Sequence, residues 1–204
     1  MGFYQHRILP RLIHFGMAQK QLMPLREQLV GGARGRVLEI GIGSGLNLPF
    51  YPRDTDLLLG LDPSRELLHM AKRHSSWVHF PVELSEGRAE NIPLEDHAVD
   101  HVVMSWTLCS VGDPLRALSE IRRVLRPGGS LLFVEHGRAP EPRISRWQER
   151  LTPLWRRLAG GCHLGRPIAR LIEASGLRLA DLETGHLIRG PRIATFHYRG
   201  RAVA

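Results

Sequence analysis

The stretch from residue 37 to residue 51, V-L-E-I-G-I-G-S-G-L-N-L-P-F-Y, combines an apolar run with closely spaced glycines. The run Val37, Leu38 and Ile40 is typical of a buried strand, and a helix is expected at 45–50. The glycines are Gly41, Gly43 and Gly45. In sheets flanked by helices, ligands bind where strands end, and glycine lets the backbone approach them closely. The stretch therefore predicts a ligand-binding loop.

Apolar runs of strand length continue along the chain and alternate with helical patterns. The expected strands are 36–40, 56–62, 79–83, 99–105, 130–135, 177–183 and 193–199. The expected helices between them include 64–74 and 114–125. This alternation predicts an α/β fold, a doubly wound and mostly parallel sheet. The last two strands are expected to be antiparallel, because only a loop separates them.

The chain is expected to form one domain, 1–204, because it shows no linker, repeat or low-complexity tract. Its expected segments are N-terminal helices (1–34), a ligand-binding core (35–136), a helical insertion after the fifth strand (137–176) and a C-terminal strand pair (177–204).

The composition is that of an ordinary globular protein, with 43% hydrophobic and 24% charged residues. The two cysteines are too few for a disulfide scaffold, which favours a reducing cytoplasm. No apolar run reaches the roughly 20 residues of a membrane span. Charged or helix-breaking residues argue against a signal peptide, namely Arg7, Pro10, Arg11 and His14. The net charge of +8 could attract nucleic acid, an anionic membrane or an acidic substrate, but its arginines are spread like a solvated surface.

Two acids accompany the glycine loop. Glu39 lies two residues before the first glycine, where its carboxylate would repel a pyrophosphate but attract a cationic ligand. Asp62 ends the second expected strand, where an acid can accept both hydrogen bonds from a ribose diol. The combination favours a binding loop over a purely structural turn.

These residues belong to a longer series: E-I-G-I-G-S-G, L-D-P-S, G-R-A-E-N-I-P-L, D-x-V-x-S and R-R-V-L-R-P-G-G-S-L-L-F-V-E. Over residues 35–136 the series resembles the class I S-adenosylmethionine-dependent methyltransferases. The resemblance implies a seven-stranded Rossmann-like sheet, S-adenosylmethionine as cofactor and S-adenosylhomocysteine as product. It places the three glycines under the methionine moiety, Asp62 on the ribose, and Ala89 and Glu90 by the adenine. Other residues expected at the cofactor are Glu39, Ser44, Asn47, Pro63, Ser64, Ser105 and Trp106.

The sequence departs from the family pattern at residue 88, and the run at 47–50 resembles a methyltransferase signature but lies in the wrong place for it. Arg88 stands where members often carry an Asp that contacts the adenine amino group. The run N-L-P-F at 47–50 looks like the N-P-P-[FY] signature that grips a target amine, but it follows the first strand instead of the fourth. The fourth strand ends without an acid or amide, so methylation of nucleobase amines is disfavoured and no nucleic-acid partner is expected.

The acceptor chemistry is expected where W-T-L-C-S-V (106–111) and E-H-G-R-A-P (135–140) follow the fourth and fifth strands. Methyl transfer from a sulfonium is an in-line displacement, so positioning supplies much of the catalysis. A thiol acceptor needs only deprotonation near a pKa of about 8.5, whereas carbon or hydroxyl acceptors need a stronger base. His136 is the candidate base and Glu135 a second candidate catalytic residue, with a structural role as the alternative for each.

A basic amphipathic helix is expected within 137–176. Its apolar face would carry Ile144, Trp147, Leu151, Leu154, Trp155 and Leu158. Arginines lie elsewhere around it, at Arg143, Arg146, Arg150 and Arg157. Such a helix could cover an apolar substrate pocket, rest on a membrane surface, or simply pack on the sheet.

The motifs T-L-C-S-V, V-L-R-P-G-G…E-H and W-Q-E-R-L-T-P-L-W-R-R-L-A-G-G-C-H-L narrow the resemblance to the microsomal alkyl-thiol S-methyltransferases and their soluble bacterial relatives, over most of 34–200. This implies methylation of small lipophilic thiols. The residues expected around the substrate are Cys109, Trp147, Trp155, Cys162 and His163. One adjacent Cys and His without a second pair do not make a metal site, so no metal is expected.

The sequence leaves several alternatives open. The bacterial relatives shade into phospholipid N-methyltransferases and quinone C-methyltransferases, whose lipid substrates would suit a peripheral contact with a membrane. The microsomal members begin with an apolar anchor, and this N-terminus is too polar for one. A cofactor-binding regulatory protein without turnover is the alternative from another class. The sequence leaves the oligomeric state open.

Overall fold

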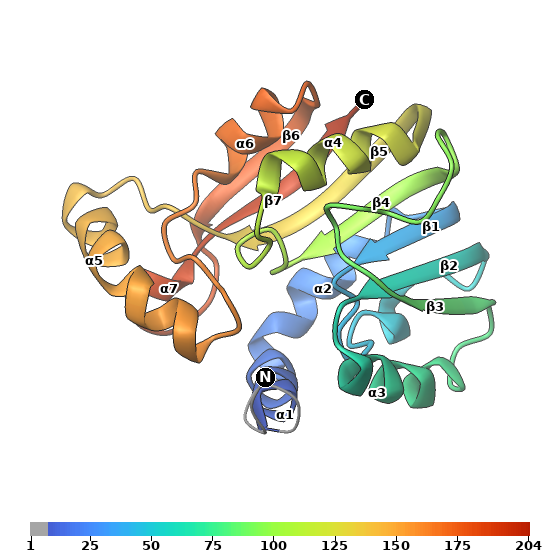
Figure 1. The fold of residues 1–204 in the computed structure, drawn as a ribbon, viewed down its shortest axis with the longest axis horizontal. Coiled ribbons are helices and arrows are strands. Elements are labelled where there is room, and N and C mark those ends of the chain that lie inside the picture. Colours follow the sequence, from blue (N-terminus) through green and yellow to red (C-terminus); the bar gives the residue numbers. More distant parts are fainter. Residues whose placement is uncertain (1–7) are drawn as a thin grey trace.

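The computed structural model describes residues 8–204, so Arg7 and the rest of 1–7 lie outside the described residues. One seven-stranded sheet has the order β3-β2-β1-β4-β5-β7-β6 (Figure 1). The strands are β1 Gly35–Ile40, β2 Thr55–Asp62, β3 Val82–Glu86, β4 Val99–Ser105, β5 Leu125–His136, β6 Arg178–His186 and β7 Phe196–Val203. Strands β1 to β5 pair in parallel, and β7 is antiparallel to both β5 and β6. The expected mostly parallel sheet with an antiparallel edge is confirmed.

Helices cover both faces of the sheet because each central strand is apolar on both sides. The helices are α1 Leu9–Met17, α2 Met23–Val30, α3 Arg65–Ser75, α4 Pro114–Val124, α5 Pro142–Leu158, α6 Ile168–Ala174 and α7 Arg192–Thr195, with 3₁₀ helices at Lys20–Leu22 and Leu48–Phe50. Leu38 and Ile40 of β1 join the apolar cluster formed with α4 and α6. Val37, the residue before Leu38, joins the cluster on the opposite face, with α2. The doubly wound arrangement follows directly from this alternation.

The helix expected at 45–50 is wrong: the segment forms a turn and the 3₁₀ helix Leu48–Phe50. Gly45 has a left-handed φ of 78°, which is incompatible with an α-helix. The side chain of Asn47 is drawn inward to hydrogen-bond Glu39. Local apolar spacing cannot reveal either constraint.

Four expected strands differ in their bounds by three or more residues at one end. The strand expected at 177–183 is β6, which continues to His186. The strand expected at 79–83 is β3, three residues later, because Pro81 cannot donate to the ladder and pairing with Leu58 begins at Val82. The strand expected at 193–199 starts only at Phe196, after the short helix α7. The fifth strand is longer than 130–135, because Leu125 already pairs with Val99 and the pairing continues from Ser130 after a register shift.

Two helices lie apart from the layered core, on the side toward which β4 and β5 point (Figure 1). In the figure, α5 projects to the left of the sheet and α1 lies below it. The loop after α5 approaches α1, since a Cβ built on Gly160 would lie 3.5 Å from Ile13. None of the helices within residues 8–204 has the length and apolar character needed to cross a membrane.

Candidate active site

A cavity of about 1280 Å³ lies at the carboxyl ends of the parallel strands, between the sheet, α1 and the end of α5. This exceeds the roughly 300–1,000 Å³ of an ordinary small-molecule site, so it has room for a cofactor and an acceptor together. The predicted site residues that line it are Gly41, Gly43, Ser44, Asp62, Pro63, Ser64, Ser105, Trp106, Cys109, His136, Trp155 and Cys162. Those outside its lining are Glu39, Gly45, Asn47, Ala89, Glu90, Glu135, Trp147 and His163.

The glycine loop and Asp62 form one hydrogen-bonded unit. The N–H of Gly43 donates to one carboxylate oxygen of Asp62 (2.9 Å) and the N–H of Ser64 to the other (2.8 Å). Burial raises the pKa of Asp62, and these two N–H groups oppose the rise. Each oxygen keeps a free lone pair, which matches the two hydroxyls of a ribose.

Gly43 leaves a cradle that a side chain would fill. Its φ is 57°, and a Cβ built there would meet only the carbonyl oxygen of Gly41, at 3.9 Å. Gly45, by contrast, packs against Ala71 of α3. The open surface at Gly43, beside Asp62, fits a nucleoside ligand laid against the backbone.

Substituting Gly43 by alanine is expected to raise the Kd for S-adenosylmethionine at least about 10-fold, because the methyl group enters the cradle. Gly128 is a matched control: its φ is 82°, and a Cβ there meets nothing within 4 Å. Both variants should lose about 1–3 kcal/mol of stability from left-handed strain. Calorimetric titration should show weakened binding only for Gly43→Ala, and equal binding by both variants would contradict the cradle.

Glu39 does not contact the cavity directly. Its carboxylate is buried and accepts hydrogen bonds from Asn47 (2.7 Å) and the hydroxyl of Tyr51 (2.8 Å). Burial raises the pKa of Glu39 to about 7, although these hydrogen bonds and nearby Arg26 oppose the rise. The carboxylate therefore anchors the loop from beneath, and direct contact of Glu39 with a cationic ligand stays a prediction.

Arg26 is a cavity residue that the sequence reasoning missed. Its guanidinium donates to the side chain of Asn47 (2.7 Å) and the carbonyl of Met17 (2.9 Å), and lies 4.9 Å from the ring centre of Trp106. Its Nε is buried and has no hydrogen-bond partner among the described residues. A carboxylate, such as that of a methionine moiety, would satisfy this donor. No sequence signal marks it, because Arg26 is one arginine of many on an early helix.

The residues expected near adenine lie outside the cavity lining. Glu90 accepts hydrogen bonds from the backbone N–H groups of Gly112 (2.9 Å) and Asp113 (3.2 Å), and pairs with Arg88. Ala89 packs in the apolar cluster with α4. Contact of these residues with adenine stays a prediction.

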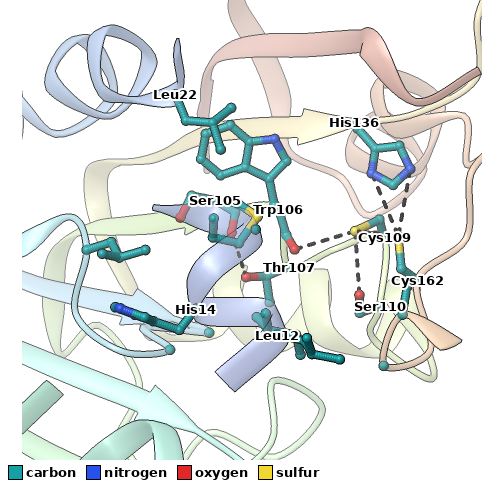
Figure 2. Close-up of a pocket in the computed structure, with 18 of the residues that line it drawn as sticks. Leu12, His14, Leu22, Ser105, Trp106, Thr107, Cys109, Ser110, His136 and Cys162 are labelled. Atoms are coloured by element: carbon teal, nitrogen blue, oxygen red, sulfur yellow. Dashed lines mark hydrogen bonds between the residues drawn. The ribbon is translucent and has the colours of Figure 1, made fainter. Parts of the chain in front are cut away.

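The other end of the cavity is formed by the loops after β4, β5 and α5. Cys109, His136 and Cys162 converge there (Figure 2): the two sulfurs are 3.7 Å apart, and His136 Nε2 is 3.8 Å from Cys162 Sγ. Trp106, which leads into this region, has an unusual φ of 50° for a bulky residue.

The electrostatics of this cluster favour a thiolate on Cys162. Its pKa is lowered by the hydrogen bond from Cys109 and by His136, although burial opposes this. Burial by itself would lower the pKa of His136, but the interactions with Cys162 and Glu135 raise it. The Cys109 thiol has its pKa raised by its hydrogen bond to Cys162 and by burial.

Glu135 does not reach the cavity. Its carboxylate accepts from the backbone N–H groups of Thr107 (2.7 Å), Leu108 (2.9 Å) and Cys109 (3.3 Å). Burial raises its pKa to about 7, against the effect of these donors. In this geometry Glu135 holds the loop that carries Cys109, and a catalytic role for it stays a prediction.

Trp147 also lies outside the cavity, contrary to expectation, and 54% of it is exposed. Helix α5 buries Ser145 and Gln148 instead of its apolar face. Gln148 is fully buried and bonds the backbone of Gly137, Ala139 and Ile193. The exposed apolar residues beside the cavity form what we call the apolar rim: Leu12, Ile13 and Phe15 of α1 with Leu154, Trp155 and Leu158 of α5.

His197, at the start of β7, is a further cavity residue not anticipated from the sequence. Burial lowers its pKa from 6.5 to about 4. Between these values the unfolded chain binds more protons than the native protein, so stability falls as the pH falls from 6.5 to 4.

We expect the stability lost over this window to be on the order of 2 kcal/mol smaller in a His197→Gln variant. Chemical denaturation of both proteins at several pH values checks this. Parallel curves for the two proteins would show that His197 is not buried in its neutral form.

These features define a class. Residues 38–133 match the family model described as a methyltransferase domain. This segment is a methyltransferase domain, and the domain together with the Rossmann-like fold implies S-adenosylmethionine as cofactor. Gly43, Asp62 and Arg26 fit that cofactor as an open cradle, a diol acceptor and an unpaired donor.

Several known proteins are similar to this chain in sequence or in fold. A 151-residue stretch, 70% of the chain, is 39% identical to the human thiol S-methyltransferase TMT1B, of which it covers 60%. A 109-residue stretch, 52% of the chain, is 37% identical to the phosphatidylethanolamine N-methyltransferase of Cereibacter sphaeroides, of which it covers 53%. The chain thus spans about six-tenths of the human relative. A solved structure from Thermotoga maritima, described as an S-adenosylmethionine-dependent and possible histamine N-methyltransferase, matches with a TM-score of 0.69 at 22% identity over 97% of this chain and 96% of that one.

Proposed function

We propose that this protein transfers the methyl group of S-adenosylmethionine to the sulfur of small, lipophilic thiols. The observation that carries the proposal is the distribution of charge around the cavity. Its acidic lining residues, Asp62, Glu66 and Glu86, all belong to the segment from β2 to β3. The opposite end is lined by Trp106, Cys109, His136, Trp155, Leu158, Cys162 and Leu164.

Such a wall suits a sulfur nucleophile better than an amine. None of the seven residues named for this end carries a carboxylate or an amide; the two amides among the described lining residues, Gln19 and Gln21, belong to the segment between α1 and α2. A thiol needs only to lose its proton, and the buried cation Arg166, next to the two cysteines, favours an anion there. The similarity to thiol S-methyltransferases points the same way.

The chain's own residues would divide the work by position. Asp62 and the glycine loop hold the cofactor, while α1 covers it through the hydrogen bond between His14 and Ser44 (2.7 Å). The apolar rim would admit the acceptor and exclude water. Positioning of this kind accounts for much of the rate in an in-line displacement.

Phospholipid N-methylation is a second candidate, which the apolar rim favours. Six large apolar side chains are 36–80% exposed there, beside several arginines of α5. A rim of this kind could equally dock on an anionic membrane and receive a lipid headgroup.

The deciding experiment measures transfer of a labelled methyl group to an alkyl thiol, to vesicles containing phosphatidylethanolamine or a quinone, and to RNA. Label on the thiol sulfur alone supports the proposal. Label in the lipid or quinone fraction alone replaces it, and tight cofactor binding without any labelled product would make the protein a sensor instead of an enzyme.

The rim can be tested on the same assay. Leu12→Ser should raise the KM for long-chain thiols more than for short ones, because Leu12 lines the cavity mouth. Leu115→Ser, a similarly exposed leucine of α4 outside the cavity, is the matched control. Equal KM changes for both chain lengths would exclude the rim from acceptor binding.

A further inference from the structure

Three side chains that can bind a metal ion meet in the cavity wall, although they are distant in sequence. Cys109 follows β4, His136 ends β5 and Cys162 follows α5. Their donor atoms all lie within 4.8 Å of one another (Figure 2). None of the steps assigned above to the cofactor loop or the rim uses this cluster.

The spacing matches a tetrahedral zinc centre. With Zn–S near 2.3 Å and Zn–N near 2.0 Å, tetrahedral ligands stand about 3.8 Å (S to S) and about 3.5 Å (S to N) apart. The observed separations are 3.7 Å between the two sulfurs, and 3.9 Å and 3.8 Å from Cys162 Sγ to Nδ1 and Nε2 of His136. The third pair, Cys109 and His136, has its donor atoms within 4.8 Å. A disulfide, by contrast, needs the sulfurs at about 2.05 Å.

A buried positive charge lies next to the two cysteines. Thiolates, not thiols, bind metals, and Arg166 provides a buried positive charge next to both cysteines. Arg166 is itself fixed by the carbonyls of Leu108 and Val111. Glu135 holds the N–H of Cys109, so the cysteine-bearing loop is rigid before any ion arrives. Two thiolates and one Zn²⁺ are together neutral, which suits a buried site.

We propose that Cys109, His136 and Cys162 bind Zn²⁺ and leave its fourth position open to the cavity, where the acceptor thiol binds as a thiolate. A site with three protein ligands keeps such an open position. The proposal rests on the proposed thiol function, and departs from the expectation of no metal, which considered only the neighbours Cys162 and His163.

The reaction balances without a further reactant. The acceptor S–H releases its proton to solvent when its sulfur binds the metal. Its electron pair then forms the new C–S bond to the methyl carbon, as the bond from that carbon to the cofactor sulfur breaks and leaves its electrons there. The neutral thioether product is a weak ligand and departs. In this arrangement His136 is a ligand and not a base.

The test uses the whole 204-residue chain, reduced, loaded with Zn²⁺ and dialysed against metal-free buffer. We expect about one zinc per chain by mass spectrometry in the wild type, and at least about a 10-fold loss in Cys109→Ser, Cys162→Ser and His136→Gln. His163→Gln, which removes the neighbouring imidazole outside the cavity lining, should retain zinc. Loss of zinc in His163→Gln, or its retention in both serine variants, would overturn the assignment.

Cobalt substitution of the wild type gives a reading that does not depend on how the variants fold. Tetrahedral Co²⁺ with thiolate ligands should absorb in the visible, and an alkyl thiol added without cofactor should shift its charge-transfer band. An octahedral spectrum, or no response to the thiol, would overturn the site.

The two proposals fail differently. Metal-free protein that methylates thiols at an unchanged rate overturns the zinc site and leaves the function standing. Protein that retains zinc but labels only lipid overturns the thiol function, and with it the acceptor role of the metal.

Discussion

Replacing Asp62 by alanine is expected to weaken S-adenosylmethionine binding by at least about 3 kcal/mol, more than about 100-fold in Kd. Two hydrogen bonds from ribose hydroxyls to a charged acceptor would be lost, each contributing about 1.5–3 kcal/mol. The N–H groups of Gly43 and Ser64 would also lose their partner, so the cradle itself would loosen. Isothermal titration measures the affinity directly.

Asp56→Ala provides the control on the same strand. Asp56 is exposed near the start of β2, far along the strand from Asp62. Its removal should leave the Kd unchanged. If Asp62→Ala, correctly folded by circular dichroism, binds the cofactor as tightly as the wild type, the ribose is held elsewhere.

Replacing Glu135 by alanine is expected to lower the free energy of unfolding by about 3–5 kcal/mol. The carboxylate is fully buried and accepts from three consecutive backbone N–H groups, of Thr107, Leu108 and Cys109. Each buried donor left without an acceptor costs about 1–3 kcal/mol. Urea denaturation monitored by tryptophan fluorescence provides the measurement.

Glu135→Gln separates the structural role from an acid–base role. Its amide oxygen can still accept hydrogen bonds, so it should lose less than half as much stability as alanine does. Its methyl-transfer rate should follow its folded fraction. A stable Glu135→Gln protein whose turnover falls strongly would show that Glu135 has an acid–base role in catalysis.

The cofactor half of the molecule was predictable because its signals are local. Alternating apolar runs identify the strands, and Asp62 is found simply as the acid at a strand end. The wrong helix prediction for 45–50 also has a local cause. The apolar residues there have helical spacing, but the left-handed φ of Gly45 and the hydrogen bond from Asn47 to Glu39 prevent an α-helix.

Side-chain direction was not predictable, and it decides the roles of the acids. Glu39 and Glu135 both lie at strand ends by sequence, yet each turns into the protein to anchor a loop. Arg26 shows the reverse case, a helix residue without any motif whose guanidinium reaches the cavity.

The sequence by itself determined the doubly wound sheet, the glycine loop and the acid that follows the second strand, because hydrophobic periodicity and turn chemistry act between neighbours in the chain. Only the tertiary structure decided which polar groups face the cavity, and that Cys109, His136 and Cys162 meet although up to 53 residues separate them. Their encounter depends on how the loops after β4, β5 and α5 pack together, and no short stretch of sequence encodes that packing.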